Sequence, residues 1–127
     1  MPTQLEHVNF TVSDCHKTAA WMGDIFGWKI RWQGPSLNDG HTIHVGTDQS
    51  YVALYTHGTP AQTQEDTYAT TGGLNHIAVT VDDLDVVEAQ VVAAGFTPKS
   101  HADYEPGRRF YFYDTDGIEY EVVCYDS

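Results

Sequence analysis

Apolar and polar residues alternate along two short segments of the chain that resemble each other. Leu5–Asp14 reads LEHVNFTVSD and Leu74–Asp83 reads LNHIAVTVDD, and five of the ten positions are identical. Strict alternation is typical of a half-buried β-strand, because successive side chains point to opposite faces of a sheet. In each copy one face is fully apolar and the other carries a histidine, His7 or His76. The pattern predicts two similar modules that share one site.

Helical periodicity follows each of these strands. Apolar residues recur at helical spacing in Cys15–Phe26 and again in Leu84–Ala94. Acidic or hydroxyl side chains precede both segments as N-cap candidates, and a glycine follows each, as is common at the end of a helix. These caps and stops are Ser13 or Asp14 with Gly27, and Asp82 or Asp83 with Gly95.

Three more strands are predicted in each module, so the order strand, helix, strand, strand, strand occurs twice. The predicted strands are Trp28–Gln33, His41–Thr47, Tyr51–Thr56, Phe96–Ser100, Arg108–Asp114 and Ile118–Tyr125, with a loop at Gly34–Gly40. Residues 58–73 are polar, lack apolar periodicity and are predicted to be a linker. We therefore expect an α+β fold with two βαβββ modules, residues 4–57 and 74–126, in one domain in total.

Composition narrows the range of partners. The chain has 127 residues and a net charge of −12, with 18 acidic residues against six Lys and Arg. This charge opposes nucleic-acid backbones and anionic membrane surfaces. With no apolar run of membrane-spanning length and no leader at the N-terminus, we expect a cytoplasmic protein that binds a small molecule. Its two cysteines are too far apart for a metal knuckle and are expected to be reduced.

Strand parity selects candidate metal ligands. The turn Thr115-Asp116 aligns with Thr47-Asp48 at an offset of 68 residues, which places Ala53 where the second module has Glu121. His7, His76 and Glu121 all lie on the polar face of their strands. Two imidazoles and one carboxylate suit a divalent first-row metal and leave positions open for water or substrate.

The same alignment sorts the remaining polar residues. It places His44 on the opposite face and His41 in the position of Arg109, and it leaves Glu119 near a turn, where we expect solvent. Tyrosines on the polar face would give an aromatic wall suited to a small, partly apolar ligand; they are Tyr51, Tyr55 and Tyr113.

The segments LEHVNFTV, GLNHIAVTVDDLD and FYFYDTDGIEYEVV together resemble the vicinal oxygen chelate superfamily of glyoxalase I, bleomycin resistance proteins and extradiol dioxygenases. The resemblance covers roughly residues 4–126. It implies paired βαβββ modules that form a curved mixed sheet around a cleft with a metal at its centre. It also implies that His7, His76 and Glu121 hold a divalent metal such as Fe, Mn, Ni, Zn or Co.

What the resemblance implies about chemistry depends on two positions. Ala53 stands where glyoxalase I has a fourth ligand, a glutamate, which argues against glyoxalase I activity itself. Tyr111 matches the tyrosine of the extradiol signature and is the candidate catalytic group, because a phenol can donate a hydrogen bond or proton to an oxyanion. Arg109, Tyr55 and Tyr113 are the candidate substrate contacts.

Three functions remain open from the sequence. The first is a metal-dependent lyase or isomerase of the glyoxalase-like type, which chelates substrate oxygens on the metal. The second is an extradiol-type dioxygenase, and the third is a resistance protein that binds a drug or metabolite without turnover. A homodimer is expected in each case, because relatives pair modules across subunits and exposed module edges favour association.

Overall fold

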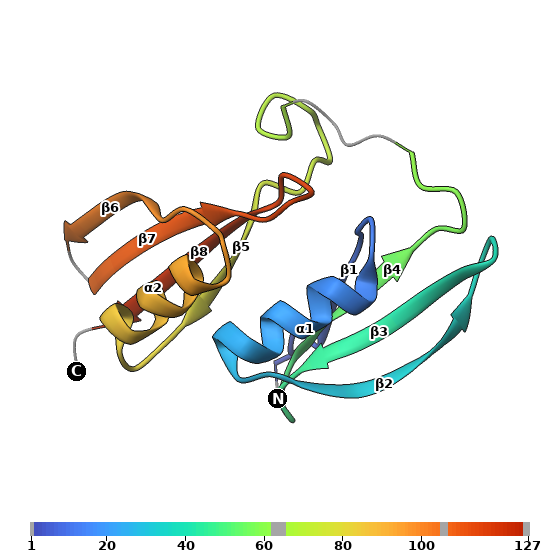
Figure 1. The fold of residues 1–127 in the computed structure, drawn as a ribbon, viewed down its shortest axis with the longest axis horizontal. Coiled ribbons are helices and arrows are strands. Elements are labelled where there is room, and N and C mark those ends of the chain that lie inside the picture. The colour runs from blue at the N-terminus through green and yellow to red at the C-terminus, as the bar shows by residue number, and fades with distance from the viewer. Residues whose placement is uncertain (1, 62–65, 105–106, 126–127) are drawn as a thin grey trace. The chain divides into compact units, whose positions relative to one another are not determined.

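The computed structural model describes residues 2–61, 66–104 and 107–125. The chain divides into two compact units, Met1–Ala61 and Gln62–Ser127, called here the first and second modules. Each module is an α+β unit with a four-stranded mixed sheet and one helix (Figure 1).

The first module follows the expected order. It consists of β1 (His7–Thr11), α1 (Cys15–Phe26), β2 (Lys29–Ser36), β3 (Gly40–Gly46) and β4 (Tyr51–Thr56). Its sheet order is β1-β4-β3-β2, with β1 parallel to β4 and the other pairs antiparallel.

The second module has the same topology. It consists of β5 (His76–Thr80), α2 (Leu84–Ala93), β6 (Lys99–Tyr104), β7 (Gly107–Tyr113) and β8 (Glu119–Tyr125). Its sheet order is β5-β8-β7-β6, with β5 parallel to β8. The prediction of two βαβββ modules is confirmed.

Both helices begin at an aspartate cap. A side-chain oxygen of Asp14 accepts hydrogen bonds from the backbone N–H groups of His16 and Lys17, and Asp83 accepts one from Val86. These bonds satisfy amides that have no partner within the helix. Gly27 follows α1 with a φ of 71°, a left-handed conformation that glycine adopts without steric cost.

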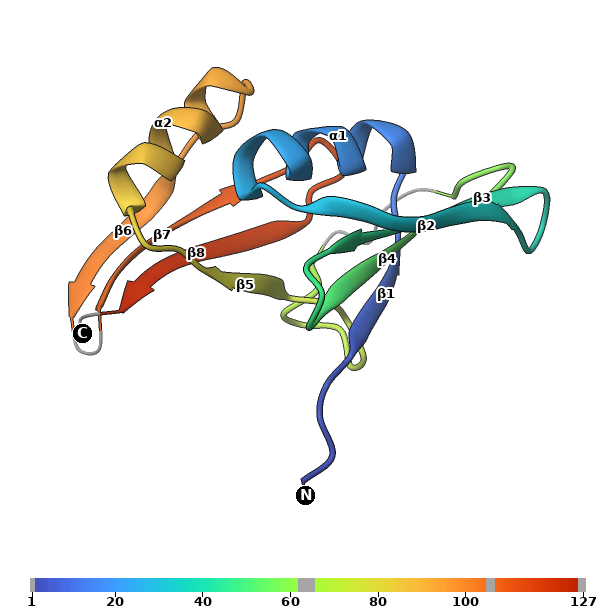
Figure 2. The ribbon, with the colours of Figure 1, turned by 90° about the horizontal axis from the view of Figure 1, so that it is seen from below.

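Each helix covers one face of its own sheet (Figure 2). In the first module α1 packs on β3 and β4, and in the second α2 packs on β8. Apolar side chains from helix and sheet are buried between these layers: Met22, Ile25, Ile43, Val45 and Leu54 in the first module, and Val91, Phe110, Phe112, Tyr120 and Val122 in the second. The opposite face of each sheet carries the side chains from the polar positions of the strands.

Two predicted strands differ from the observed ones by more than one residue at an end. β2 extends through Gly34 to Ser36, because β3 pairs with it up to the contact of Ser36 with Gly40. The predicted strand Phe96–Ser100 is wrong, since β6 runs from Lys99 to Tyr104. Pro98 has no N–H to donate to a ladder, so pairing with β7 begins only after it.

The register of β3 corrects the faces predicted for two histidines. The β3–β4 pair sets His44 opposite Ala53, whereas the β7–β8 pair sets Tyr111 opposite Glu121. The sequences of the two modules therefore align at an offset of 68 residues after the turn at Thr47-Asp48 and Thr115-Asp116, but at an offset of 67 residues before it. His44 lies on the polar face with His7, and His41 stacks on His16 of α1 at 4.8 Å, so both predicted faces were wrong. A one-residue slip moves a strand residue to the opposite face.

Candidate functional site

The polar face of the second module brings His76 beside two buried glutamates. His76 on β5 is paired with Glu119 of β8, and two residues further along the parallel strands Ala78 is paired with Glu121. Both glutamates are only 7% exposed. The expectation that Glu119 is solvated is therefore wrong. Buried carboxylates require partners, and this face supplies them.

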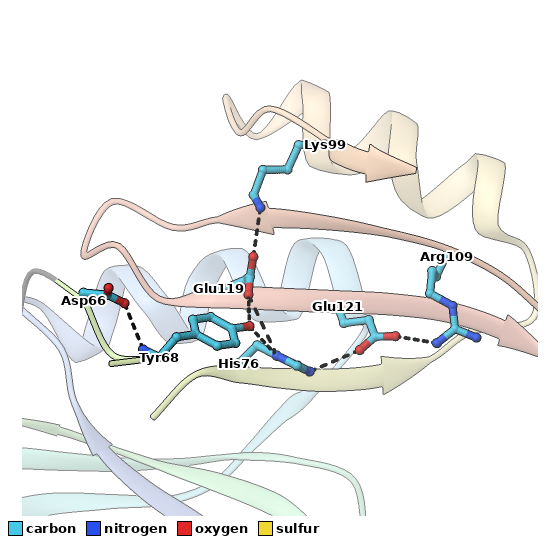
Figure 3. Close-up of polar contacts among 7 residues, drawn as sticks. All are labelled: Asp66, Tyr68, His76, Lys99, Arg109, Glu119 and Glu121. Atoms are coloured by element: carbon cyan, nitrogen blue, oxygen red, sulfur yellow. Dashed lines mark hydrogen bonds and ion pairs between the residues drawn. The ribbon is translucent and has the colours of Figure 1, made fainter. Parts of the chain in front are cut away.

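Glu121 is held between His76 and Arg109. Its Oε1 lies 3.2 Å from Nε2 of His76, and its Oε2 accepts a hydrogen bond of 2.9 Å from Nη1 of Arg109 (Figure 3). The guanidinium also lies over the ring of Tyr104, at 4.6 Å from the ring centre. Among the residues that the structure describes, the one buried side-chain polar atom without a hydrogen-bond partner is Nε of Arg109. Arg109 therefore positions Glu121 and keeps one unused donor.

Glu119 is held by Lys99 and Tyr68. Nζ of Lys99 donates to Oε2 at 2.8 Å, and the phenol of Tyr68 donates to Oε1 at 2.6 Å (Figure 3). Burial acts to raise the pKa of Glu119, but these two hydrogen bonds outweigh it and leave the pKa below its usual value. The bond to Glu119 in turn raises the pKa of Tyr68 to about 12. Glu119 is thus an anion and Tyr68 a neutral phenol at physiological pH.

Tyr68 also contacts His76. Its hydroxyl oxygen lies 3.0 Å from Nδ1 of His76, on the side of the ring opposite Glu121. A local turn holds the tyrosine, because Asp66 accepts hydrogen bonds from the backbone N–H groups of Tyr68 and Ala69. The sequence analysis assigns this segment to the linker, yet 66–73 supplies a side chain to the polar face of the second module.

The first module has a corresponding arrangement around His7. Nδ1 of His7 lies 2.8 Å from Oε1 of Glu6, and the hydroxyl of Tyr51 donates to the same oxygen at 3.2 Å. The hydrogen bond to His7, followed by that from Tyr51, lowers the pKa of Glu6. Within the described residues of this module, Nε2 of His7 has no hydrogen-bond partner.

The two histidines therefore have the same two kinds of partner, a carboxylate and a phenol, in the opposite order. His7 contacts a carboxylate that is backed by a phenol, whereas His76 contacts a phenol that is backed by a carboxylate. Tyr51 is paired with His7, and Glu119 with His76, at equivalent positions of the two sheets. In both modules the partner engages Nδ1, which is how proteins commonly orient a metal-binding histidine that coordinates through Nε2.

The tyrosines predicted as site residues lie on the polar face, each with a definite contact. Tyr111 of β7 meets the ring of His76 edge-on at 5.8 Å, and burial followed by the charge of Glu121 raises its pKa. Tyr113 lies beneath Nζ of Lys99, 4.4 Å from the ring centre. The hydroxyl of Tyr55 donates to the carbonyl of Leu37 at 2.5 Å and so holds the β2–β3 turn.

The contacts of His76 and Glu121 fit a divalent metal. Ligand atoms about 2.1 Å from one metal ion are separated by about 3.0 Å at a right angle and about 3.4 Å at a tetrahedral angle. The separation between His76 Nε2 and Glu121 Oε1 is 3.2 Å. No group of three or more His, Cys, Asp or Glu side chains forms a metal site among the described residues, and His7 belongs to the other module.

Three residues of this face were missed or misplaced by sequence reasoning: Tyr68, Lys99 and Glu119. Tyr68 is in a segment without periodicity, and its contact with Glu119 joins residues 51 positions apart. Lys99 is the first residue of β6, whereas the sequence predicts that this strand begins at Phe96. Only Glu119 carried a usable signal, because it shares the parity of Glu121 on a strand that was correctly recognised.

Comparison with known proteins identifies the class. The family model described as the Glyoxalase/Bleomycin resistance protein/Dioxygenase superfamily matches residues 4–122. The chain therefore belongs to this superfamily, as its repeated modules and polar face had indicated. A search of curated proteins finds no significant match.

Solved structures share the fold at low sequence identity. A glyoxylase/bleomycin resistance protein/dioxygenase domain from Frankia sp. EAN1pec is 23% identical, with a TM-score of 0.83 over 100% of this chain and 95% of that one. FosX, a fosfomycin resistance protein from Listeria monocytogenes solved with Mn(II) and sulfate, is 23% identical, with a TM-score of 0.77 over 99% and 95%. FosX from Mesorhizobium loti is 23% identical, with a TM-score of 0.74 over 97% and 92%.

None of the helices in the described part of the chain has the length and apolar character that a membrane span requires.

Proposed function

We propose that the protein is a metal-dependent enzyme of the glyoxalase-like, lyase or isomerase type, with His7, His76 and Glu121 as the ligands of one divalent metal. The observation that carries the proposal is the matched orientation of the two histidines. Each has Nδ1 engaged by one member of a hydrogen-bonded carboxylate–phenol pair, and Nε2 of His76 faces Glu121 at 3.2 Å. The Mn(II) bound by a FosX of the same fold supports a divalent metal.

A bound divalent metal supplies Lewis acidity toward adjacent oxygens of a small substrate. The chain's own groups would orient that substrate and move its protons. Arg109 holds Glu121 in place. Tyr111 stays protonated beside His76 and would donate a hydrogen bond or proton where negative charge develops. Tyr55 and Tyr113 would line the aromatic side of the site.

Phosphonate substrates are disfavoured. The two described cations of the second module's polar face, Lys99 and Arg109, are each paired with a glutamate, at 2.8 and 2.9 Å. A dianionic phosphonate would have to compete with these buried carboxylates in a chain of net charge −12. We therefore propose a neutral or weakly charged substrate with neighbouring oxygens, and we expect the enzyme to act as a cytoplasmic homodimer.

A row of rings in the first module supports a second candidate, the binding of a flat ligand without turnover. His7, Tyr51, His44 and Trp32 follow one another with centroid separations of 4.8, 4.8 and 5.1 Å. Trp32 at the end of the row is 52% exposed, so its ring has room for a stacked ligand. Such a protein would need neither metal nor Glu121.

Metal analysis tests the first candidate. Untagged protein is measured for bound metal by elemental analysis, together with His76→Ala, Glu121→Gln and the control His101→Ala. His101 is exposed and paired with Glu88, so its loss removes a histidine without touching the polar face. We expect about one metal per chain in the parent and in the control, and much less in the two ligand variants. Equal metal content in all four proteins would contradict the proposal.

Ligand binding separates the two candidates. Glu121→Gln should abolish turnover if the protein is an enzyme, whereas it should leave the affinity for an aromatic ligand unchanged if the protein only binds. A dioxygenase of the same fold would be recognised by iron in the metal analysis and by oxygen consumption.

A further inference from the structure

The contacts of Tyr68 determine where its single proton lies. Its hydroxyl is 2.6 Å from Oε1 of Glu119 and 3.0 Å from Nδ1 of His76. The shorter distance is typical of a hydroxyl that donates to an ionised carboxylate. Lys99 keeps Glu119 ionised by donating to its other oxygen at 2.8 Å. The phenol proton therefore points to Glu119, and the phenol oxygen is left as an acceptor.

The direction of this hydrogen bond determines which ring nitrogen of His76 carries a hydrogen. Because the phenol oxygen accepts, Nδ1 of His76 must carry the hydrogen of that contact. In a neutral imidazole the lone pair is then on Nε2, which faces Oε1 of Glu121 at 3.2 Å. Two acceptors at this distance repel each other unless a cation lies between them. The hydrogen bonds on one side of the ring thus prepare a cation-binding pair on the other side.

We propose that Tyr68 is a positioning residue that sets the Nδ1–H tautomer and the ring orientation of His76. Lys99 and Tyr68 both donate to Glu119, and His76 donates to Tyr68, so these hydrogen bonds converge on Glu119 and present Nε2 of His76 to a metal ion (Figure 3). The inference deepens the proposed function and rests on His76 being a metal ligand. It also assigns a role to the turn at Asp66, which holds Tyr68 against the sheet.

The conservative variant Tyr68→Phe removes the phenol oxygen and keeps the ring. Tyr125→Phe is the matched control, since Tyr125 has a similar exposure, 52% against 61% for Tyr68, and lies at the end of β8 opposite to Glu119. The first measurement is the tautomer of His76 in metal-free protein, from imidazole ¹⁵N chemical shifts in alkaline buffer. We expect Nδ1–H in the parent and the control, and a shift toward Nε2–H in Tyr68→Phe, because that hydrogen then bonds to Glu121. A Nε2–H tautomer in the parent, or no change in the variant, would overturn the inference.

The second measurement is Zn²⁺ affinity by competition with a chelator. Loss of a partner that orients a metal ligand typically weakens metal binding 10- to 100-fold, so we expect a decrease of about that size in Tyr68→Phe and none in the control. Affinity within about twofold of the parent would overturn the inference. Glu119→Gln provides a second variant and should also increase the Nε2–H population. If the parent binds no Zn²⁺ but shows the Nδ1–H tautomer that Tyr68→Phe removes, the positioning role holds and the proposed function fails.

Discussion

The ion pair between Arg109 and Glu121 gives the most quantitative prediction. Nη1 of Arg109 and Oε2 of Glu121 are 2.9 Å apart, and their side chains are only 12% and 9% exposed. Removing one partner of a buried pair costs about 3–5 kcal/mol, since a charge is left without compensation. Both side chains keep a little contact with water, so we expect the low end, about 3 kcal/mol, for Arg109→Met. Glu121→Gln should cost about 2 kcal/mol, because Gln still accepts from Arg109.

A double-mutant cycle isolates the pair. We expect the double variant to be about 3 kcal/mol less stable than the parent. The two single losses, about 3 and about 2 kcal/mol, together exceed that loss by a coupling free energy of about 2 kcal/mol. The assay is urea unfolding in chelator-treated buffer, which keeps metal binding out of the measurement.

The neighbouring residue supplies the control cycle. Arg108 on the same strand pairs with Asp85 at 2.8 Å, but these side chains are 50% and 75% exposed. For Arg108→Met and Asp85→Asn we expect a coupling below about 0.5 kcal/mol, reduced further by salt. Equal coupling in the two cycles would refute the reasoning that burial, and not contact distance, gives the Arg109 pair its strength.

Three further predictions concern stability. Tyr120→Phe removes a buried hydrogen bond of 3.1 Å to Asp114 and should cost about 1.5–3 kcal/mol in urea unfolding; a loss below about 0.5 kcal/mol would contradict it. The pKa of Glu119 lies below its ordinary value of 4.5 in the folded protein, so its stabilising contribution is present above that pH and is lost as pH falls further. The stability difference between parent and Glu119→Gln should therefore shrink in acid, and a constant difference would refute this. Gly27→Ala should cost about 1 kcal/mol because of its φ of 71°, whereas Gly23→Ala inside α1 should stabilise by about 0.5–1 kcal/mol, both read from thermal unfolding.

Local patterns in the sequence were sufficient for the elements that repeat. The alternation around His7 and His76 predicted β1 and β5, and helical spacing predicted both helices to within one residue. These predictions succeeded because each pattern depends only on residues that are a few positions apart in the sequence. The aspartate caps and the glycine after α1 are local in the same sense.

The polar face of β8 was also predictable, and with it the placement of Glu121 beside His76. Parity on a recognised strand carries over to spatial neighbours once the parallel pairing with β5 is assumed. The role of these residues as metal ligands stays a prediction. Parity failed at His44, because one residue of difference in a turn reverses the face of every side chain before it.

The duplication, the order of elements and the strands that carry the candidate ligands all follow from the amino-acid pattern alone. Which groups surround those ligands depends on the folded chain. Tyr68, Lys99 and Glu119 meet through strand register and a turn that no periodic pattern marks. The physical reason is that hydrophobic periodicity encodes which face is buried, whereas hydrogen bonds between distant residues depend on how strands align and where a loop returns to the sheet.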